Sequence, residues 1–488
     1  MFVSKDCKML NFKKNKLFMI LFLILVLLTI SSSGCSENLE NKNIEASNST
    51  REFSDNYSFY SGMSHPFVEL ETGYFIQAYN ALHYMDKATN EIVLFSNDPI
   101  SMSELIDLGF EHGVVENDAS FISSSIFYQN EKIYIADADP PDLSKPQTSD
   151  SFTIKLLEVD PKTHERKHLF DFQSYFADFI LTDDKIFTIE TIYTLEDVQQ
   201  VETSSGESEK IESETDPTNS DVTQTDFNQQ TTVEYLLNSF DLIANKKNEP
   251  IKLPTPKQYL ANESSAPIIS AYQNKVFVEL NFTKYEEEQS QTNLYIYDVN
   301  SEDIMILELS NYELENPKNN QSAESIFNYA FLDEKMYLTK RNSNPIEPEI
   351  GLYLYDNSTT SFWVADLDGQ NMKEFPTLEG DYRMISNGKY LYAIPSSFHQ
   401  YSDELDQSQF LSFFSVYKFE NDQWEKHYDV DTTDIGEAGA RIASVALNSE
   451  GDLFLFSYSG EEIFFVQKGI ISKILDYQQY IDKHVIYD

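Results

Sequence analysis

Residues 274–280 read NKVFVEL, and residues 294–307 read LYIYDVNSEDIMIL. In both segments aromatic and aliphatic residues alternate with polar ones, and this period of two indicates half-buried β-strands. The polar run DVNSED separates two apolar stretches of the second segment, which is typical of a β-hairpin. The two segments therefore predict a unit of three antiparallel strands: one strand, a gap, and then a hairpin.

This unit occurs seven times along the chain. The first strands are GYFIQA (73–78), EKIYIA (131–136), DKIFTIE (184–190), NKVFVEL (274–280), EKMYLT (334–339), GKYLYAI (388–394) and GDLFLFS (451–457). The hairpins are HYMDKATNEIVLF (83–95), LLEVDPKTHERKHLF (156–170), LNSFDLIANKKNEPIKL (237–253), LYIYDVNSEDIMIL (294–307), FWVADLDGQNMKEF (362–375), SVYKFENDQWEKHY (415–428) and EEIFFVQKGIISKIL (461–475). Successive first strands lie about 53–63 residues apart, apart from one step of about 90.

A repeat of this length with several strands predicts the blade of a β-propeller. One blade leaves both sheet faces exposed, whereas blades arranged around an axis bury their faces against each other. We therefore expect an all-β protein with a single propeller over residues 65–475. Seven blades are predicted, with six as the alternative because the first and last copies match the pattern least well.

The repeats also resemble the propellers of TolB-like proteins and of exported Gram-positive lipoproteins. In those proteins a D-K-I-Y-Y type strand is paired with an L-Y-x-x-D-x-D-G type hairpin. The matching residues here are DKIF (184–187) and ADLDG (365–369). The resemblance spans most of residues 65–475. It implies a propeller on an exported lipoprotein and implies no catalytic residue.

The N-terminal segment predicts export and a lipid anchor. Five lysines precede the uncharged run LFMILFLILVLLTI (17–30), which is the arrangement of a secretory signal. This run is shorter than the roughly 20 residues of a spanning helix, and an uncleaved anchor is the alternative. The tetrad SSGC (32–35) resembles a bacterial lipobox, apart from serine in place of the usual leucine. The resemblance implies that residues 1–34 are a lipoprotein signal peptide and that Cys35 carries the lipid.

Residues 35–64 are polar and are expected to form a flexible tether between Cys35 and the propeller. The other cysteine of the chain, Cys7, lies in the signal, so disulfides do not stabilise the folded body. The net charge of −46 argues against nucleic acid as a partner, because phosphate binding requires a basic surface. We expect a monomer at the extracellular face of a bacterial membrane.

Two polar segments interrupt the repeats. Residues 198–232 are acidic and almost free of aliphatic residues, which predicts a disordered insertion in the third blade. The stretch DADPPDLSKPQTSDS (137–151) predicts a shorter loop in the second blade. Residues 476–488 form a C-terminal tail, and the stretch ISKILDYQQYIDKHVIYD (471–488) is interpreted as a last strand followed by a short helix.

The sharpest catalytic motif is HERKH (164–168), which has the H-E-x-x-H spacing of zinc proteases. On a helix, His164 and His168 would share one face, Glu165 would be the general base, and Glu190 could be a third ligand. The motif lies, however, where the sister repeats have hairpin turns, and residues four apart in a strand are about 13 Å apart. We therefore reject His164, Glu165 and His168 as a metal site.

Two acidic clusters have a spacing similar to that of cation-binding loops. Asp137, Asp139 and Asp142 lack the glycine and glutamate that an EF-hand requires, so only weak Ca²⁺ binding is a possibility there. The DLDG segment (366–369) is better explained as a β-turn whose glycine has positive φ. We predict no catalytic residue, no resident metal and no cofactor.

The sequence favours a non-enzymatic binding or scaffold protein that uses the propeller to recognise a protein or glycan. The alternative is a surface hydrolase or lyase of glycans or peptides, with carboxylates at the mouth of the propeller channel. A third hypothesis is a partner of a transporter or signalling system. An enzyme would place several Asp, Glu or His side chains together with shifted pKa values, whereas a binding module would not.

Overall fold

The computed structural model divides the chain into two compact units, Met1–Glu45 and Ala46–Asp488. All the described residues belong to the second unit, so Cys35 and the tether lie outside them. The structure describes residues 66–78, 81–95, 125–138, 153–173, 178–182, 184–197, 229–256, 260–261, 267–284, 289–313, 323–343, 359–402, 407–433, 442–457 and 462–476. Within these ranges there is no α-helix, and therefore no helix that could cross a membrane.

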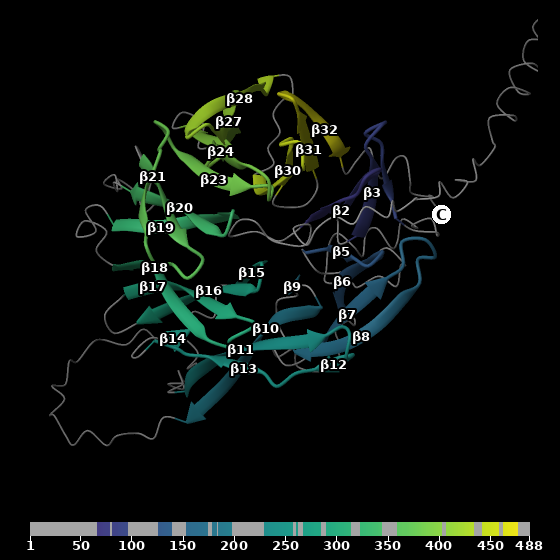
Figure 1. Ribbon diagram of the computed structural model, residues 1–488, viewed down its shortest axis with the longest axis vertical. Coiled ribbons are helices and arrows are strands. Elements are labelled where there is room, and N and C mark those ends of the chain that lie inside the picture. Colours follow the sequence, from purple (N-terminus) through teal and green to yellow (C-terminus); the bar gives the residue numbers. More distant parts are fainter. Residues whose placement is uncertain are drawn as a thin grey trace, which may run out of the picture. The chain divides into compact units, whose positions relative to one another are not determined.

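The described residues form seven antiparallel blades, each built from one stretch of chain, and a separate two-stranded sheet, and this confirms the seven-bladed propeller (Figure 1). Strands are hydrogen-bonded in sequence order within each blade. The first strands of blades 1 to 7 are β1 (Phe67–Glu69), β5 (Phe127–Gln129), β9 (Phe179–Leu181), β15 (Ile268–Tyr272), β19 (Ala323–Leu332), β23 (Tyr382–Ser386) and β29 (Ile442–Leu447). The second strands are β2 (Gly73–Ala78), β6 (Lys132–Ala138), β10 (Lys185–Asp197), β16 (Lys275–Lys284), β20 (Lys335–Ser343), β24 (Leu391–Pro395) and β30 (Leu453–Ser457).

The outer half of each blade is the predicted hairpin. The third strands are β3 (Ala81–Asp86), β7 (Thr153–Val159), β11 (Gln229–Asp241), β17 (Gln289–Asp298), β21 (Thr359–Asp366), β27 (Phe413–Glu420) and β31 (Glu462–Gln467). The fourth strands are β4 (Ile92–Leu94), β8 (Arg166–Gln173), β12 (Lys246–Lys247) with β13 (Ile251–Leu253), β18 (Ile304–Glu313), β22 (Lys373–Phe375), β28 (Gln423–Asp431) and β32 (Ile470–Asp476). Three short strands are additional: β14 (Leu260–Ala261) pairs with β16, and β25 (His399–Ser402) pairs with β26 (Gln407–Phe410).

The order of the strands gives the propeller two different rims. Because neighbouring strands are antiparallel, turns from first to second and from third to fourth strands lie on one rim, here called the hairpin rim. Connections from second to third strands, and from one blade to the next, lie on the opposite rim, here called the loop rim. The β25–β26 hairpin belongs to the loop rim, and so do the paired ends of β10 and β11 at Asp197 and Gln229.

The turns on the hairpin rim have conformations that recur from blade to blade. Several two-residue turns have positive φ at both central positions, the conformation that matches the twist of the strands: Asn130-Glu131, Asp333-Glu334, Asn421-Asp422 and Lys468-Gly469. Longer turns between third and fourth strands place one residue with positive φ at a common position: Asn90, His164, Asn245 and Glu302.

A lysine at the start of the second strand pairs with an aspartate at the end of the third strand in three blades. The pairs are Lys132–Asp160 at 2.5 Å, Lys275–Asp298 at 2.7 Å and Lys335–Asp366 at 2.5 Å. The same aspartates accept hydrogen bonds from backbone N–H groups of the turn, as Asp298 Oδ1 does from Asn300 and Ser301. The recurring lysine and aspartate of the repeat are therefore a structural pair that closes the blade on this rim.

The first and last blades meet without exchanging a strand among the described residues. Their contact is an apolar cluster in which the Phe454 ring lies 5.1 Å from Phe67 and 5.0 Å from Tyr74. Polar bonds reinforce it: Glu69 accepts hydrogen bonds from the Ser449 backbone N–H at 2.7 Å and from Lys87 Nζ at 2.7 Å. Side-chain packing and buried hydrogen bonds thus join the ends of the ring.

The structure corrects the predicted repeat in one respect, because each blade has four strands and not three. The missing strand is the first, and it is short and buried, as in β9, where all three residues are buried. A strand that is buried on both faces has no polar alternation.

Two predicted boundaries also change. The insertion expected at 198–232 ends earlier, because residues 229–232 belong to β11 and pair with the end of β10. Backbone pairing depends on amide groups and not on apolar side chains, so a polar sequence can continue a hairpin. Residues 198–228 lie outside the described residues. The last strand, β32, ends at Asp476, one residue beyond the predicted end of the propeller, and residues 477–488 also lie outside.

Candidate functional site

The H-E-x-x-H motif spans a turn and the start of a strand, and it is not on a helix. His164 is the positive-φ residue of the turn between β7 and β8, with φ of 61°, and its ring stacks on Phe95 of blade 1 at 4.1 Å. His168 lies within β8, where its Nε2 is 2.7 Å from Asp171 Oδ1. Glu190 is in β10 of another blade and accepts a hydrogen bond from Asn238 at 2.7 Å. These three residues have separate structural partners.

The acidic clusters also lie in turns or strands. Asp137 is in β6 and its Oδ2 is 3.4 Å from Arg166 Nη1, whereas Asp139 and Asp142 lie outside the described residues. The DLDG segment is a β-turn in which the Gly369 N–H donates to the Asp366 carbonyl at 2.9 Å and Gly369 has φ of 77°. Among the described residues no group of three or more His, Cys, Asp or Glu side chains could hold a metal ion.

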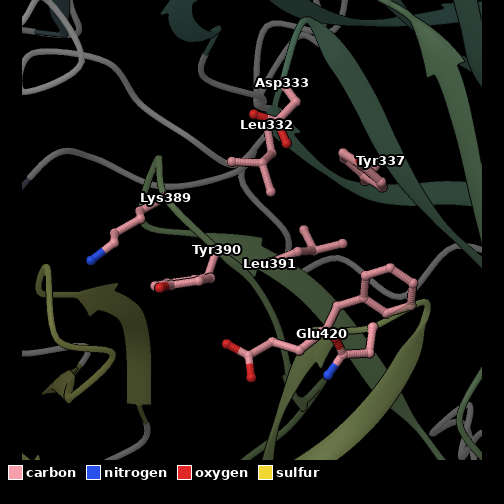
Figure 2. Close-up of a pocket in the computed structure, with 9 residues that line it drawn as sticks. Leu332, Asp333, Tyr337, Lys389, Tyr390, Leu391 and Glu420 are labelled. Carbon is pink, nitrogen blue, oxygen red and sulfur yellow. The ribbon is translucent and has the colours of Figure 1, made fainter.

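A pocket of about 500 Å³ opens between blades 5 and 6 on the hairpin rim, and we call it the blade 5–6 pocket. Three short segments line it: the β19–β20 turn with the following strand, the β23–β24 turn, and the end of β27. The lining residues are Leu332, Asp333, Tyr337, Lys389, Tyr390, Leu391, Phe419, Glu420 and Asn421. Figure 2 shows Lys389, Tyr390 and Glu420 extending toward the same side of the pocket. Its size is within the usual range for small-molecule sites.

The blade 5 side of the pocket is fixed by its other neighbour, blade 4. The Asp333-Glu334 turn donates backbone hydrogen bonds to the Tyr272 hydroxyl of blade 4, and the Tyr272 ring stacks on Phe331 at 5.4 Å. Burial, followed by the charge of Asp333, raises the pKa of Tyr337 above its usual value. This turn is therefore anchored away from blade 6.

The blade 6 side is fixed in the opposite direction, by blade 7. Asn387 Nδ2 donates to the backbone carbonyl of Asn448 at 2.9 Å and to that of Ser449 at 3.3 Å. Its Oδ1 accepts from the backbone N–H of Tyr390 at 2.9 Å, which shapes the turn that carries Lys389 and Tyr390. The two turns bordering the pocket are thus bonded to opposite neighbours, and the space between them stays open.

Blade 6 lacks the lysine–aspartate pair seen in blades 2, 4 and 5. Its third strand ends in Glu420, which forms an ion pair with Lys418 of the same strand. Lys389, at the repeat position of the pairing lysine, has no ion pair with any described residue, and its Nζ lies 5.1 Å from the centre of the Tyr390 ring. Lys418 Nζ lies 3.4 Å from the same ring centre. The departure from the repeat pattern therefore directs one lysine to the pocket.

A chain of aromatic contacts supports the remaining wall. Tyr337 meets Phe375 edge to face at 5.1 Å, and Phe375 lies 4.5 Å from Phe419. Phe419 in turn lies 5.1 Å from Trp424, whose Nε1 donates to the Pro376 carbonyl at 2.6 Å. Trp424 is one of only two tryptophans in the chain, so its fluorescence can report on the pocket.

A separate acidic group lies between blades 4 and 5. Burial raises the pKa of Glu279, in β16, from 4.5 to about 7. Burial first, and the charge of Glu279 second, raise the pKa of Tyr329 in β19 well above its usual value. Glu279 is the described carboxyl whose protonation is set to change near neutral pH.

None of the pocket residues was predicted from the sequence. They come from three turns spread over residues 332–421, and only packing of two blades brings them together. One signal was present: in blade 6 the hairpin SVYKFENDQWEKHY has Glu420 where most other copies have aspartate. A break in the pairing pattern of the repeat marks a position where the lysine has become available for another contact.

Comparisons with known proteins concern the propeller alone. No protein-family model matches the chain, and no curated protein matches it. The propeller domain of the Trilobed protease from Pyrococcus furiosus, described as having an open velcro topology, is 10% identical with a TM-score of 0.37, covering 72% of this chain and 82% of that one. An acylaminoacyl peptidase is 9% identical with a TM-score of 0.41, covering 88% of this chain and 54% of its own length. An oligogalacturonate lyase in complex with manganese is 8% identical with a TM-score of 0.33, covering 72% and 83%.

These chains are too distant to transfer an activity or a residue role. This chain spans about half of the acylaminoacyl peptidase, so the two differ in length as well as in sequence. The seven blade sheets, five of four strands and two of five, assign the fold directly: the described part of the chain is a seven-bladed β-propeller.

Proposed function

We propose that the chain is an exported lipoprotein of the TolB-like kind from a Gram-positive bacterium, and that its propeller is a non-enzymatic recognition module. A lipid on Cys35 anchors it, residues 35–64 form the tether, and the propeller recognises a glycan or protein ligand outside the cell. Its ligand site is the blade 5–6 pocket. The protein acts as a monomer.

Sequence features support the anchor. The basic and apolar segments, the SSGC tetrad and the polar stretch after Cys35 follow one another in the order of a lipoprotein signal. Acyl chains add about 0.8 kcal/mol per buried methylene, so a diacylated cysteine holds a protein on a bilayer. The net charge of −46 disfavours direct adsorption to anionic lipid and is consistent with a body kept away from the surface by its tether.

The observation that carries the proposal is the blade 5–6 pocket. Its walls combine the aromatic rings of Tyr337, Tyr390 and Phe419 with a few charged and amide groups. Apolar walls with a few placed polar groups are the usual composition of recognition sites. Both bordering turns are hydrogen-bonded to neighbouring blades, so the pocket exists before a ligand binds and little ordering entropy is lost on binding.

Photocrosslinking on intact cells tests this function. A photoreactive amino acid replaces Asn421, an exposed pocket residue, and in a control chain it replaces Glu131 in the corresponding rim of blade 2. We expect a crosslinked surface ligand from position 421 and none from position 131. Equal crosslinking from the two positions would contradict recognition by the pocket.

The anchor is tested in the same cells. Cys35→Ser should move the protein from the membrane fraction to the medium, and mass spectrometry of the wild-type N-terminus should find a lipid-modified cysteine. Retention of the Cys35→Ser chain in the membrane, with residues 1–34 still present, would instead establish an uncleaved anchor.

Glu279 supports a hydrolase or lyase as the second candidate. A carboxyl with a pKa of about 7 can exchange protons at neutral pH, as general acid–base catalysis requires. If the chain is such an enzyme, it should hydrolyse or cleave chromogenic glycosides or aminoacyl anilides. Glu279→Gln should then lower the rate of that reaction at least a hundredfold. Turnover that survives Glu279→Gln would exclude this residue as the acid–base group.

A further inference from the structure

We propose that the blade 5–6 pocket binds an uncharged saccharide, with one sugar ring between its aromatic walls. This inference rests on the proposed function and adds the chemical class of the ligand. It is carried by the charge balance of the pocket, by its aromatic surface and by the distribution of its hydrogen-bonding groups.

The pocket is electrically balanced on a strongly acidic protein. Among the lining residues Asp333 and Glu420 are negative and Lys389 is positive. Lys418 lies outside the lining and forms an ion pair with Glu420, which leaves Asp333 and Lys389 to balance each other. The chain as a whole carries −46. A site for a cation would keep the acidic excess, and a site for a phosphate would carry a net positive charge. A balanced site favours a ligand without net charge.

The walls provide apolar surface of the kind that covers the faces of sugar rings. Tyr337 and Phe419 belong to one aromatic chain that bridges blades 5 and 6 through Phe375. Tyr390 stands on the other side, and its orientation is fixed by Lys418 Nζ at 3.4 Å from the ring centre. Rigid aromatic rings supply contact area at a low cost in side-chain entropy.

The polar groups of the pocket suit hydroxyl groups, which both donate and accept hydrogen bonds. The carboxylates of Asp333 and Glu420 can accept from hydroxyls, while Lys389 and the Asn421 amide can donate to them. These four groups lie on three separate turns, so they surround the opening. A ligand with hydroxyls along its edge and apolar C–H groups on its faces satisfies both sets of contacts.

Calorimetry with the full chain tests the inference. The protein is solubilised in a detergent without a sugar headgroup, because a maltoside would compete for the site. The probes are glucose, N-acetylglucosamine, cellobiose and chitobiose, with glycylglycine as a zwitterion, choline as a cation and inorganic phosphate as an anion. We expect saturable binding of at least one of the four saccharides, accompanied by a change in Trp424 fluorescence, and no binding of the zwitterion, the cation or the anion.

Variants then locate the binding. Tyr390→Ala should weaken the saccharide at least tenfold, and Lys389→Ala, which changes an exposed side chain, should weaken it severalfold even if the first variant unfolds. Tyr128→Ala, at a half-buried tyrosine on the same rim of blade 2, is the matched control and should bind like the wild type.

Three results would overturn the inference. The first is that none of the four saccharides saturates the wild type. The second is that a saccharide binds both variants as tightly as it binds the wild type. The third is that glycylglycine, choline or phosphate binds in place of a sugar. In the last case, loss of that binding in Lys389→Ala would leave recognition by the pocket intact. Failure of the proposed function is separate, since it requires that no ligand crosslinks specifically to position 421 on cells.

Discussion

Two seams between neighbouring blades, both on the hairpin rim, differ in how their turns are bonded. At the seam of blades 7 and 1, the β29–β30 turn is bonded directly to blade 1, because Ser449 donates to Glu69 from its N–H at 2.7 Å and from its hydroxyl at 2.9 Å. At the seam of blades 5 and 6, the two facing turns are each bonded to the blade on their other side. The first seam is filled, and the second contains a pocket.

The difference shows that blades of the same repeat can form either a closed contact or a pocket between them. All seven blades have the same backbone plan, so the fold tolerates a gap between two of them while the others stay packed. The 7–1 seam joins the ends of the ring and depends on side chains alone, since no described strand crosses it. The 5–6 seam has continuous chain between its blades and can leave room for a ligand. Four predictions test this comparison.

The largest effect is expected from Phe454→Ala at the 7–1 seam. Phe454 is fully buried and contacts rings of both blades, so its removal leaves a cavity and should lower the free energy of unfolding by about 3–5 kcal/mol. Phe419→Ala at the 5–6 seam removes a half-buried ring beside an existing pocket and should lower it by about 1–2 kcal/mol. Urea unfolding followed by circular dichroism measures both. Equal losses would refute the distinction between the seams.

Glu69→Ala tests the polar part of the 7–1 seam. The Glu69 side chain is 10% exposed, and its loss leaves Lys87 and Ser449 without an acceptor. We expect the free energy of unfolding to fall by about 2–3 kcal/mol. Glu131→Ala is the control, because Glu131 is 48% exposed and pairs with Lys162 at 3.0 Å, so the loss should stay below about 1 kcal/mol. Similar losses in thermal unfolding of the two variants would argue against a special role for Glu69.

Glu279→Gln extends the comparison to a third seam, between blades 4 and 5, through its pH dependence. The pKa of Glu279 is about 7 in the folded chain and 4.5 when unperturbed, so the folded state binds the proton more tightly. Stability due to this group is therefore present at low pH and is lost as the pH rises through 7. At pH 9 the Gln variant should be more stable than the wild type by on the order of 2 kcal/mol.

The measurement for Glu279 is urea unfolding at pH 5 and at pH 9. The wild type should lose stability between these values relative to the Gln variant, and Glu374→Gln, at an exposed position of β22, should follow the wild type. A Gln variant that is less stable than the wild type at pH 9 would contradict the assignment.

The smallest effect is expected from Asn387→Ala, which acts on the pocket through the turn that carries Lys389 and Tyr390. Without the bonds from Asn387 to blade 7 the turn is less ordered, and saccharide affinity should fall about tenfold, or about 1.4 kcal/mol. Asn274→Ala, in the corresponding turn of blade 4, removes a bond to Asp298 and should leave the affinity unchanged. The calorimetric titration distinguishes the two. Unchanged affinity in Asn387→Ala would show that this asparagine does not position the pocket.

Much of the fold could be predicted because the repeat depends on residues that are close together in the sequence. Alternating strands, a lysine or an aspartate at many of the strand ends, and turns such as DVNSED are each specified by neighbouring residues, and the strand pattern occurs seven times. The first strand of each blade could not be predicted in the same way. In β9 the sequence FIL is buried on both sides, and three apolar residues do not distinguish a strand from any other buried segment.

The candidate site could not be predicted, because no single segment contains it. Asp333, Lys389 and Glu420 are ordinary turn residues in the sequence, and they become one site only when two blades pack against each other. The zinc-like spacing of His164 and His168 is the opposite case: a motif visible in the sequence whose turn conformation separates its members.

The sequence by itself therefore indicated the class of fold and favoured seven blades over six, and it predicts a signal that ends before Cys35, since these depend on hydrophobic period, turn composition and segment length. Tertiary structure alone decided which seam is filled and which contains a pocket. The physical reason is that the groups which fix each turn belong to other blades: at the 7–1 seam Glu69 of blade 1 accepts from the β29–β30 turn, and at the 5–6 seam the two bordering turns bond to blades 4 and 7.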